Sequence, residues 1–93
     1  MQNVQTIGFQ NISGQLDMLK FVMFVVNYHA GRGRPAETAL KKATMFVGRP
    51  EAKKPSYEDE GRTMILPIDK ESPKVYACIN ETGGLTFMLA TEY

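Results

Sequence analysis

The chain of 93 residues contains one histidine and one cysteine, His29 and Cys78, and any nucleophilic or acid–base chemistry would have to begin with these side chains. A hydrolytic site needs a nucleophile, a base and a third group that orients the base. His29 falls at the end of an expected helix, and Cys78 falls in an expected strand beside Tyr76 and Ile79, so both positions indicate structural roles. We therefore predict that the protein is not an enzyme.

Metal and cofactor sites have little support in the sequence. A lone histidine and a lone cysteine cannot build the common zinc sites, and no Asp-x-Asp or Glu-x-x-His pair is present. The acidic run Glu58-Asp59-Glu60 lies in a polar stretch and is expected to be solvated. Neither of the common glycine-rich phosphate-binding motifs occurs. We expect no metal and no cofactor.

Charge is unevenly distributed along the chain, although the net charge is only +1. The segment 32–54 has seven basic and two acidic residues, a net +5, and the rest of the chain has four basic and eight acidic residues, a net −4. Such polarisation steers anionic partners towards one side of a protein, although surface lysines also serve solubility. The predicted anion- or partner-binding residues are Arg32, Arg34, Lys41, Lys42, Arg49, Lys53 and Lys54.

Within this segment, Arg32-Gly33-Arg34-Pro35 resembles the core of an AT-hook, a short arm that binds the minor groove of A·T-rich DNA. That resemblance covers four residues, and it implies contact with nucleic acid. The further basic and proline residues that flank the core in that family are replaced here by Ala30-Gly31 and Ala36-Glu37. The same residues also form a glycine-rich connector before an expected helix N-terminus, a position that favours anions.

The element expected before this connector is a helix from about Gly14 to Ala30, with Ser13 as its N-cap and Gly31 at its end. Between Met18 and Tyr28 only two residues are polar, so the helix is apolar on all sides and must be covered on all sides. Either it lies between a sheet and a second helix, or its spare face meets another subunit; a buried strand is an alternative for part of the run. The predicted oligomer interface consists of Phe21, Val22, Phe24, Val25 and Tyr28.

Helical spacing of apolar residues predicts a second helix from Pro35 to Val47, with Gly48 as its left-handed terminus. A loop is expected over 49–61, followed by three strands over 62–68, 74–80 and 85–91 that are joined by short turns. A weak strand pattern over 4–9 adds a fourth candidate. The predicted fold class is α+β, with two layers: two helices packed on a three- or four-stranded antiparallel sheet in the order (β)-α-α-β-β-β.

Length and composition predict a single domain over residues 1–93. No signal peptide is recognisable, and the apolar run 16–30 is too short and too interrupted to cross a bilayer. The absence of a cysteine pair favours a reducing compartment, so we expect a cytoplasmic protein without a membrane partner.

Two classes of function remain open. The first is a self-associating protein-interaction module, a modulator or inhibitor of the kind that viruses and mobile elements encode, which docks on a host or cellular protein through its basic face. The second is a binder of an anionic ligand, either nucleic acid or a phosphorylated nucleotide, through the segment 32–54.

Overall fold

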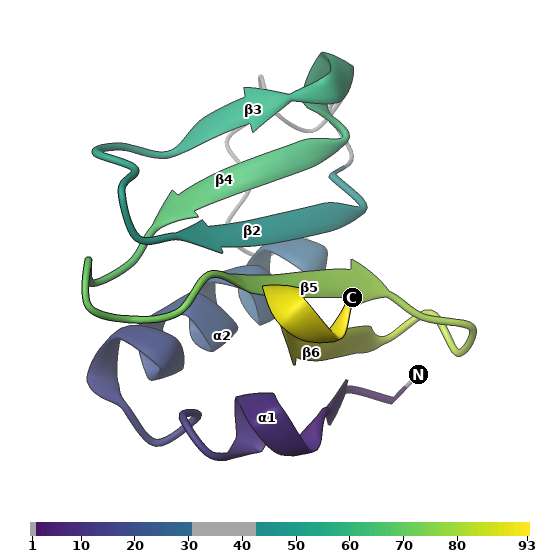
Figure 1. The fold of residues 1–93 in the computed structure, drawn as a ribbon. Helices are drawn as coiled ribbons and strands as arrows, with labels where there is room; N and C mark the ends of the chain where they lie inside the picture. The colour runs from purple at the N-terminus through teal and green to yellow at the C-terminus, as the bar shows by residue number, and fades with distance from the viewer. Residues whose placement is uncertain (1, 31–42) are drawn as a thin grey trace.

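The computed structural model describes residues 2–30 and 43–93, which form a six-stranded mixed sheet with one long helix against one face (Figure 1). The elements in chain order are β1 (Val4–Gln5), α1 (Ile7–Gln10), α2 (Leu16–His29), β2 (Met45–Arg49), β3 (Ser56–Glu58), the 3-10 turn η2 (Asp59–Gly61), β4 (Thr63–Pro67), β5 (Val75–Ile79), β6 (Leu85–Leu89) and the 3-10 turn η3 (Ala90–Glu92). In space the strands follow the order β1-β6-β5-β2-β4-β3.

The predicted fold class is wrong in its strand count and in its strand pairing. The last three strands do not form a meander, because β2 lies between β4 and β5 and pairs with β4 in parallel and with β5 antiparallel. Only β5 and β6 form the expected antiparallel hairpin. The sequence between β4 and β5 contains turn residues, but a turn does not determine which strand becomes the neighbour. Instead, β2 is an interior strand of the sheet, and its three central residues, Phe46–Gly48, are all buried.

The predicted second helix is also wrong where it can be compared, because Met45–Arg49 is a strand; residues 35–42 of that prediction lie outside the described residues. Phe46 points towards α2, and Val47 points to the opposite face of the sheet. Both are buried, Phe46 against Tyr28 of α2 and Val47 on the other face, where it is paired across the sheet with Tyr76. A continuous apolar run is therefore compatible with either a helix or an interior strand. Gly48 does not end a helix: a Cβ at this position would lie 2.6 Å from Cγ2 of Val75 on β5.

Near the N-terminus, the expected strand over 4–9 is divided into the short strand β1 and the single helical turn α1. The turn begins because the Thr6 hydroxyl accepts a hydrogen bond from the Phe9 amide at 3.2 Å, which caps α1 and directs Phe9 into the core. Ser13 does not cap α2: its hydroxyl donates to the Gln10 carbonyl, and the N-cap of α2 is Gln15. The expected loop over 49–61 contains the edge strand β3.

Four predicted elements agree with the structure to within two residues at each end. These are the long helix α2 and the strands β4, β5 and β6. Within the described residues, no helix has the length and apolarity required to span a membrane.

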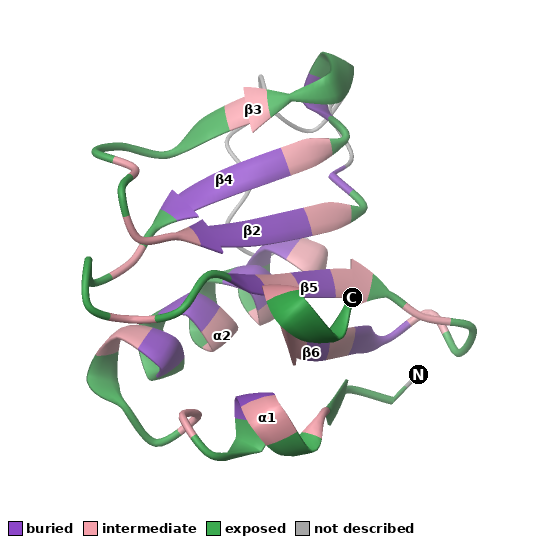
Figure 2. Ribbon diagram, viewed as in Figure 1, coloured by how far each residue is buried: buried purple, intermediate pink, exposed green. Residues whose placement is uncertain are grey.

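The hydrophobic core lies between α2 and one face of the sheet, where Figure 2 shows buried residues on both layers. Aromatic contacts join the layers: the ring of Phe21 meets Phe87 on β6 at 6.3 Å, and the ring of Tyr28 meets Phe46 on β2 at 5.6 Å. The described core residues are Phe9, Met18, Phe21, Val25, Tyr28, Ala43, Phe46, Met64, Leu66, Val75, Ala77, Leu85 and Phe87. One face of α2 is therefore fixed against the sheet along its whole length.

The opposite face of the sheet has no long helix among the described residues, and longer side chains cover its centre. Arg49 on β2 forms an ion pair with Glu58 on β3 at 3.7 Å. Because β4 lies between these strands, the pair spans β4 on the face that carries the buried Ile65. Further along this face, the ring of Tyr76 meets that of Tyr93 at 5.2 Å.

Candidate functional site

The outward face of α2 exposes more large apolar side chains than any other element that the structure describes. Leu16, Leu19 and Met23 are spaced three and four residues apart, so they share one side of the helix. Their exposed fractions are 68, 47 and 64%. We call these three residues the outer stripe. A helix of a monomeric protein normally places polar residues in this position.

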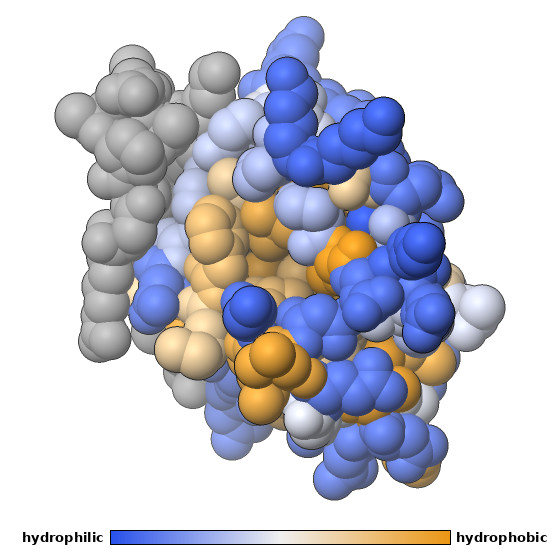
Figure 3. All heavy atoms as spheres, turned by 90° about the vertical axis from the view of Figure 1, so that its left-hand side faces the viewer, coloured by the Kyte–Doolittle hydropathy of each residue, from blue (hydrophilic) through white to orange (hydrophobic). Residues whose placement is uncertain are grey.

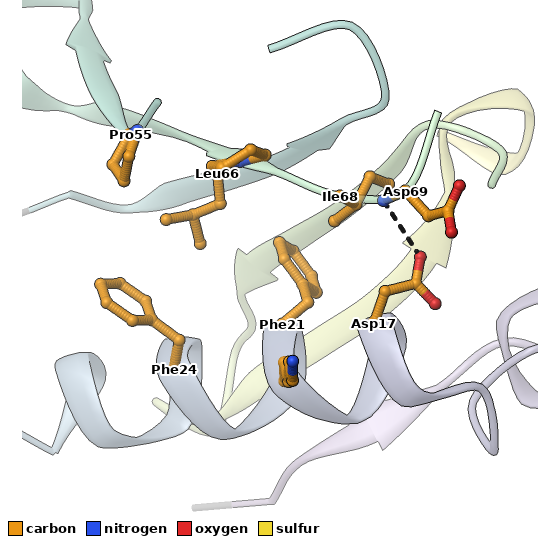
Figure 4. A pocket seen from close by; sticks show the side chains of 9 residues that line it. Asp17, Phe21, Phe24, Pro55, Leu66, Ile68 and Asp69 are labelled. Carbon is orange, nitrogen blue, oxygen red and sulfur yellow. Dashed lines mark hydrogen bonds between the residues drawn. The ribbon is translucent and has the colours of Figure 1, made fainter. Parts of the chain in front are cut away.

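Beside the outer stripe, a groove opens between α2 and the end of β4 (Figures 3 and 4). Its volume is about 370 Å³. Phe21 and Leu66 line it and belong to the core, which gives the groove a firmly packed floor. The rest of its apolar lining is Phe24, Pro55, Pro67 and Ile68. Figure 3 shows apolar atoms gathered in a hollow on this side of the molecule, with hydrophilic atoms around it. We refer to this feature as the groove throughout.

One end of the groove is acidic. The carboxylate of Asp17, in the first turn of α2, accepts hydrogen bonds from the Ser72 hydroxyl and, at 3.3 Å, from the Asp69 amide (Figure 4). The carboxylate of Asp69 accepts from the Glu71 amide at 3.0 Å, which orders the turn after β4. Lys20 also lines the groove and is exposed, one helical turn after Asp17. The groove therefore combines an apolar floor with carboxylates that are held in place.

The two side chains with catalytic potential have structural partners and point away from each other. The His29 ring nitrogen Nε2 lies 2.7 Å from the Gly83 carbonyl oxygen and ties the end of α2 to the β5–β6 turn. Cys78 is on the face of β5 that points away from α2, with its Sγ 3.0 Å from Sδ of Met45. Burial raises the pKa of the Cys78 thiol, which lowers the fraction of reactive thiolate at neutral pH.

Three of the seven predicted anion- or partner-binding residues are described by the structure. Arg49 is paired with Glu58, whereas Lys53 and Lys54 are exposed in the link between β2 and β3. The other four, Arg32, Arg34, Lys41 and Lys42, lie outside the described residues, as does the stretch that resembles an AT-hook core. The prediction of an anion site on segment 32–54 therefore stays a prediction.

The five residues predicted to form an oligomer interface take different positions around α2. Phe21, Val25 and Tyr28 are buried against the sheet, Val22 is half-buried, and Phe24 is 43% exposed in the groove. The surface left open on α2 is therefore built mainly from residues that the sequence prediction did not name, namely those of the outer stripe. The available signal was the position of Lys20 and Asn27, which lie on the same side of the helix as the outer stripe and are exposed with it.

No group of histidine, cysteine, aspartate and glutamate side chains within residues 2–30 and 43–93 is arranged to hold a metal ion. Comparisons of the chain with protein-family models, with curated proteins and with solved structures find no match. The geometry of α2 and of the groove beside it is therefore the main guide to function.

Proposed function

We propose that this protein is a small protein-interaction module that binds through the outward face of α2 and associates with itself there. The observation that carries the proposal is the exposure of the outer stripe, whose three large apolar side chains lie together on one helix. Contiguous apolar surface of this kind is uncommon on monomers and often marks a contact site. Two copies that bury it against each other would form a symmetric interface from one surface patch.

The chemistry of the outer stripe suits a contact surface that adapts to its partner. Met23 is the most exposed methionine in the described part of the chain. Its flexible and polarizable side chain can pack against surfaces of different shape. Phe24 follows it and extends the apolar surface into the groove. The same helix is held rigidly from behind by the core, so binding orders little besides side chains.

A role in binding rather than catalysis is supported by the positions of His29 and Cys78, each of which contacts a structural partner. We propose that the protein works as a modulator or inhibitor of a larger cellular or host protein, in the cytoplasm and without a cofactor. In this role its effect comes from occupying a surface of that protein.

Sedimentation equilibrium of the intact chain tests self-association directly. We expect the wild-type protein to form an oligomer and Met23→Asp to be monomeric, because a charge in the centre of the outer stripe would be buried without a partner. Tyr93→Asp is the matched control: it adds the same charge at a position that is 77% exposed on the other side of the sheet, and it should leave the oligomer intact. Circular dichroism verifies that both variants are folded. A wild-type protein that stays monomeric at all concentrations would refute the proposal.

A further inference from the structure

We infer that the groove binds a segment of a partner protein in which an aromatic or branched apolar residue is followed by a basic residue. This inference rests on the proposed role as a protein-interaction module, but it does not require self-association. The groove and the outer stripe lie on different sides of α2 and make separate demands on a partner. They can therefore be tested separately.

The size of the groove limits what it can accept. Pockets for small ligands span roughly 300–1,000 Å³. At about 370 Å³ the groove is at the lower end of this range, and it is open along one side. It therefore has room for one large side chain with its adjoining backbone, and not for a packed helix.

The lining of the groove selects an apolar side chain. Phe21 and Leu66 are only 3 and 6% exposed, and both belong to the core, so the floor is fixed before any partner arrives. Figure 4 shows two side chains that face the groove from opposite layers: Phe24 on α2, and Pro55, the residue that precedes β3 in the chain. A flat ring inserted between them would contact apolar atoms on both sides. Because the site is already formed, little binding energy is lost in ordering it.

The charges around the groove select a basic neighbour for that side chain. Asp17, Asp69 and Glu71 lie at the same end, against the single basic residue Lys20. No lysine or arginine among the described residues is within ion-pair distance of these three carboxylates. The Asp17 carboxylate is also held by two hydrogen-bond donors, so its position is set. A guanidinium that reaches this end would form charge-assisted hydrogen bonds, whereas a carboxylate would be repelled.

Chemical-shift mapping with capped dipeptides tests the inference on the intact protein. N-acetyl-Phe-Arg-amide is titrated into ¹⁵N-labelled protein, with N-acetyl-Phe-Glu-amide and N-acetyl-Ala-Arg-amide as matched probes. We expect the first probe to bind with a dissociation constant of about 1 mM and to shift the amides of residues 17–24 and 66–71. The Phe-Glu probe should bind at least about threefold more weakly, because a rim charge pair contributes up to about 1 kcal/mol. The Ala-Arg probe should give no shifts localised to the groove.

Variants then assign the two parts of the site. Phe24→Ala should abolish the response to the Phe-Arg probe. Asp69→Asn keeps an oxygen that can accept from the Glu71 amide, and it should remove most of the preference for Phe-Arg over Phe-Glu. Tyr93→Ala removes an exposed ring on the sheet face away from α2, so it is the control and should bind as the wild type does. Equal binding of the Phe-Arg and Phe-Glu probes, shifts away from the groove, or no shifts at all would each overturn the inference.

These outcomes are separable from those of the proposed function. If the wild-type chain is monomeric but the Phe-Arg probe binds in the groove, self-association fails and the groove inference stands. If Met23→Asp dissociates an oligomer but the probes do not bind, the proposal of self-association through the outer stripe is supported and the inference about the groove fails. The titration can be repeated on Met23→Asp, in which association cannot cover the groove.

Discussion

Large apolar side chains lie on both faces of α2, but only those of the inner face are buried; the outer face also carries the two polar residues Lys20 and Asn27. The inner face carries Met18, Phe21, Val25 and Tyr28, all buried, while Leu16, Leu19 and Met23 on the outer face remain largely exposed. Hydrophobicity of the helix therefore does not distinguish the residues that hold the fold together from those left for another molecule. The sheet makes the distinction, because it covers one side of the helix only.

The largest effect expected from this comparison is on stability. Phe21→Ala should lower the free energy of unfolding by about 3–5 kcal/mol, because it removes a buried ring and leaves a cavity against Phe87. Met23→Ala, two residues along the same helix, should change it by less than about 0.5 kcal/mol. Urea denaturation followed by circular dichroism measures both variants, at a protein concentration low enough to keep the chain monomeric. Similar losses for the two variants would mean that α2 has no distinct outer face.

The exposed fraction of Phe24 lies between those of Phe21 and Met23, so its truncation should have an intermediate effect on stability. Its ring is 43% exposed and stacks on Tyr28 at a centroid separation of 6.3 Å. Phe24→Ala should therefore cost about 1 kcal/mol, the typical value for a point substitution and well below a core truncation. The same denaturation experiment measures it. A loss as large as that of Phe21→Ala would make Phe24 a core residue and would weaken its assignment to the groove.

The smallest change in the free energy of unfolding is expected from a polar contact that is remote from both faces of α2. Glu92 accepts hydrogen bonds from the Thr6 hydroxyl at 2.6 Å, from the Leu89 amide and from the Gly8 amide, and these bonds lower the pKa of Glu92 below its usual value of 4.5. A carboxyl whose pKa is lower in the folded state stabilises the fold above its unfolded-state pKa, and this contribution is lost as the pH falls through the folded-state pKa.

Glu92→Gln should therefore be slightly less stable than the wild type at pH 7; the difference should begin to shrink near pH 4.5 and vanish only below the lowered folded-state pKa of Glu92. Urea denaturation of the two proteins over a pH series provides the test. A difference that persists unchanged in acid would show that the charge of Glu92 is not what stabilises the N-terminal turn.

Local signals explain which parts of the fold were predictable. The strands β5 and β6 alternate between buried and less buried side chains, and turn residues precede and follow β5 and precede β6, so these limits can be read from the sequence. The end of β6 has no such signal. The segment Met45–Arg49 could not be assigned in the same way, because an interior strand buried on both faces loses that alternation. Its parallel pairing with β4 depends on contacts between segments that are distant in the sequence, and local sequence patterns do not report such contacts.

The candidate site was predictable in part for the same reason. The unusual apolarity of α2 is evident from the sequence, and in the structure this helix does expose large apolar side chains. The side of α2 that faces outward is indicated only by Lys20 and Asn27, two polar residues seven positions apart that are both exposed. The groove was missed altogether, because its lining residues come together only in the folded protein: the Asp69 amide donates a hydrogen bond to Asp17, and Pro55 lies across the groove from Phe24.

The claim that the outer face of α2 is a contact surface can be tested by methionine oxidation, without any substitution. Peroxide converts exposed methionine to its sulfoxide, and mass spectrometry of peptides measures the rate at each site. In dilute protein, Met23, at 64% exposed, should oxidise much faster than Met18, at 0%. At high concentration, association should slow Met23 towards the rate of Met18. A rate at Met23 that does not depend on protein concentration would contradict the claim.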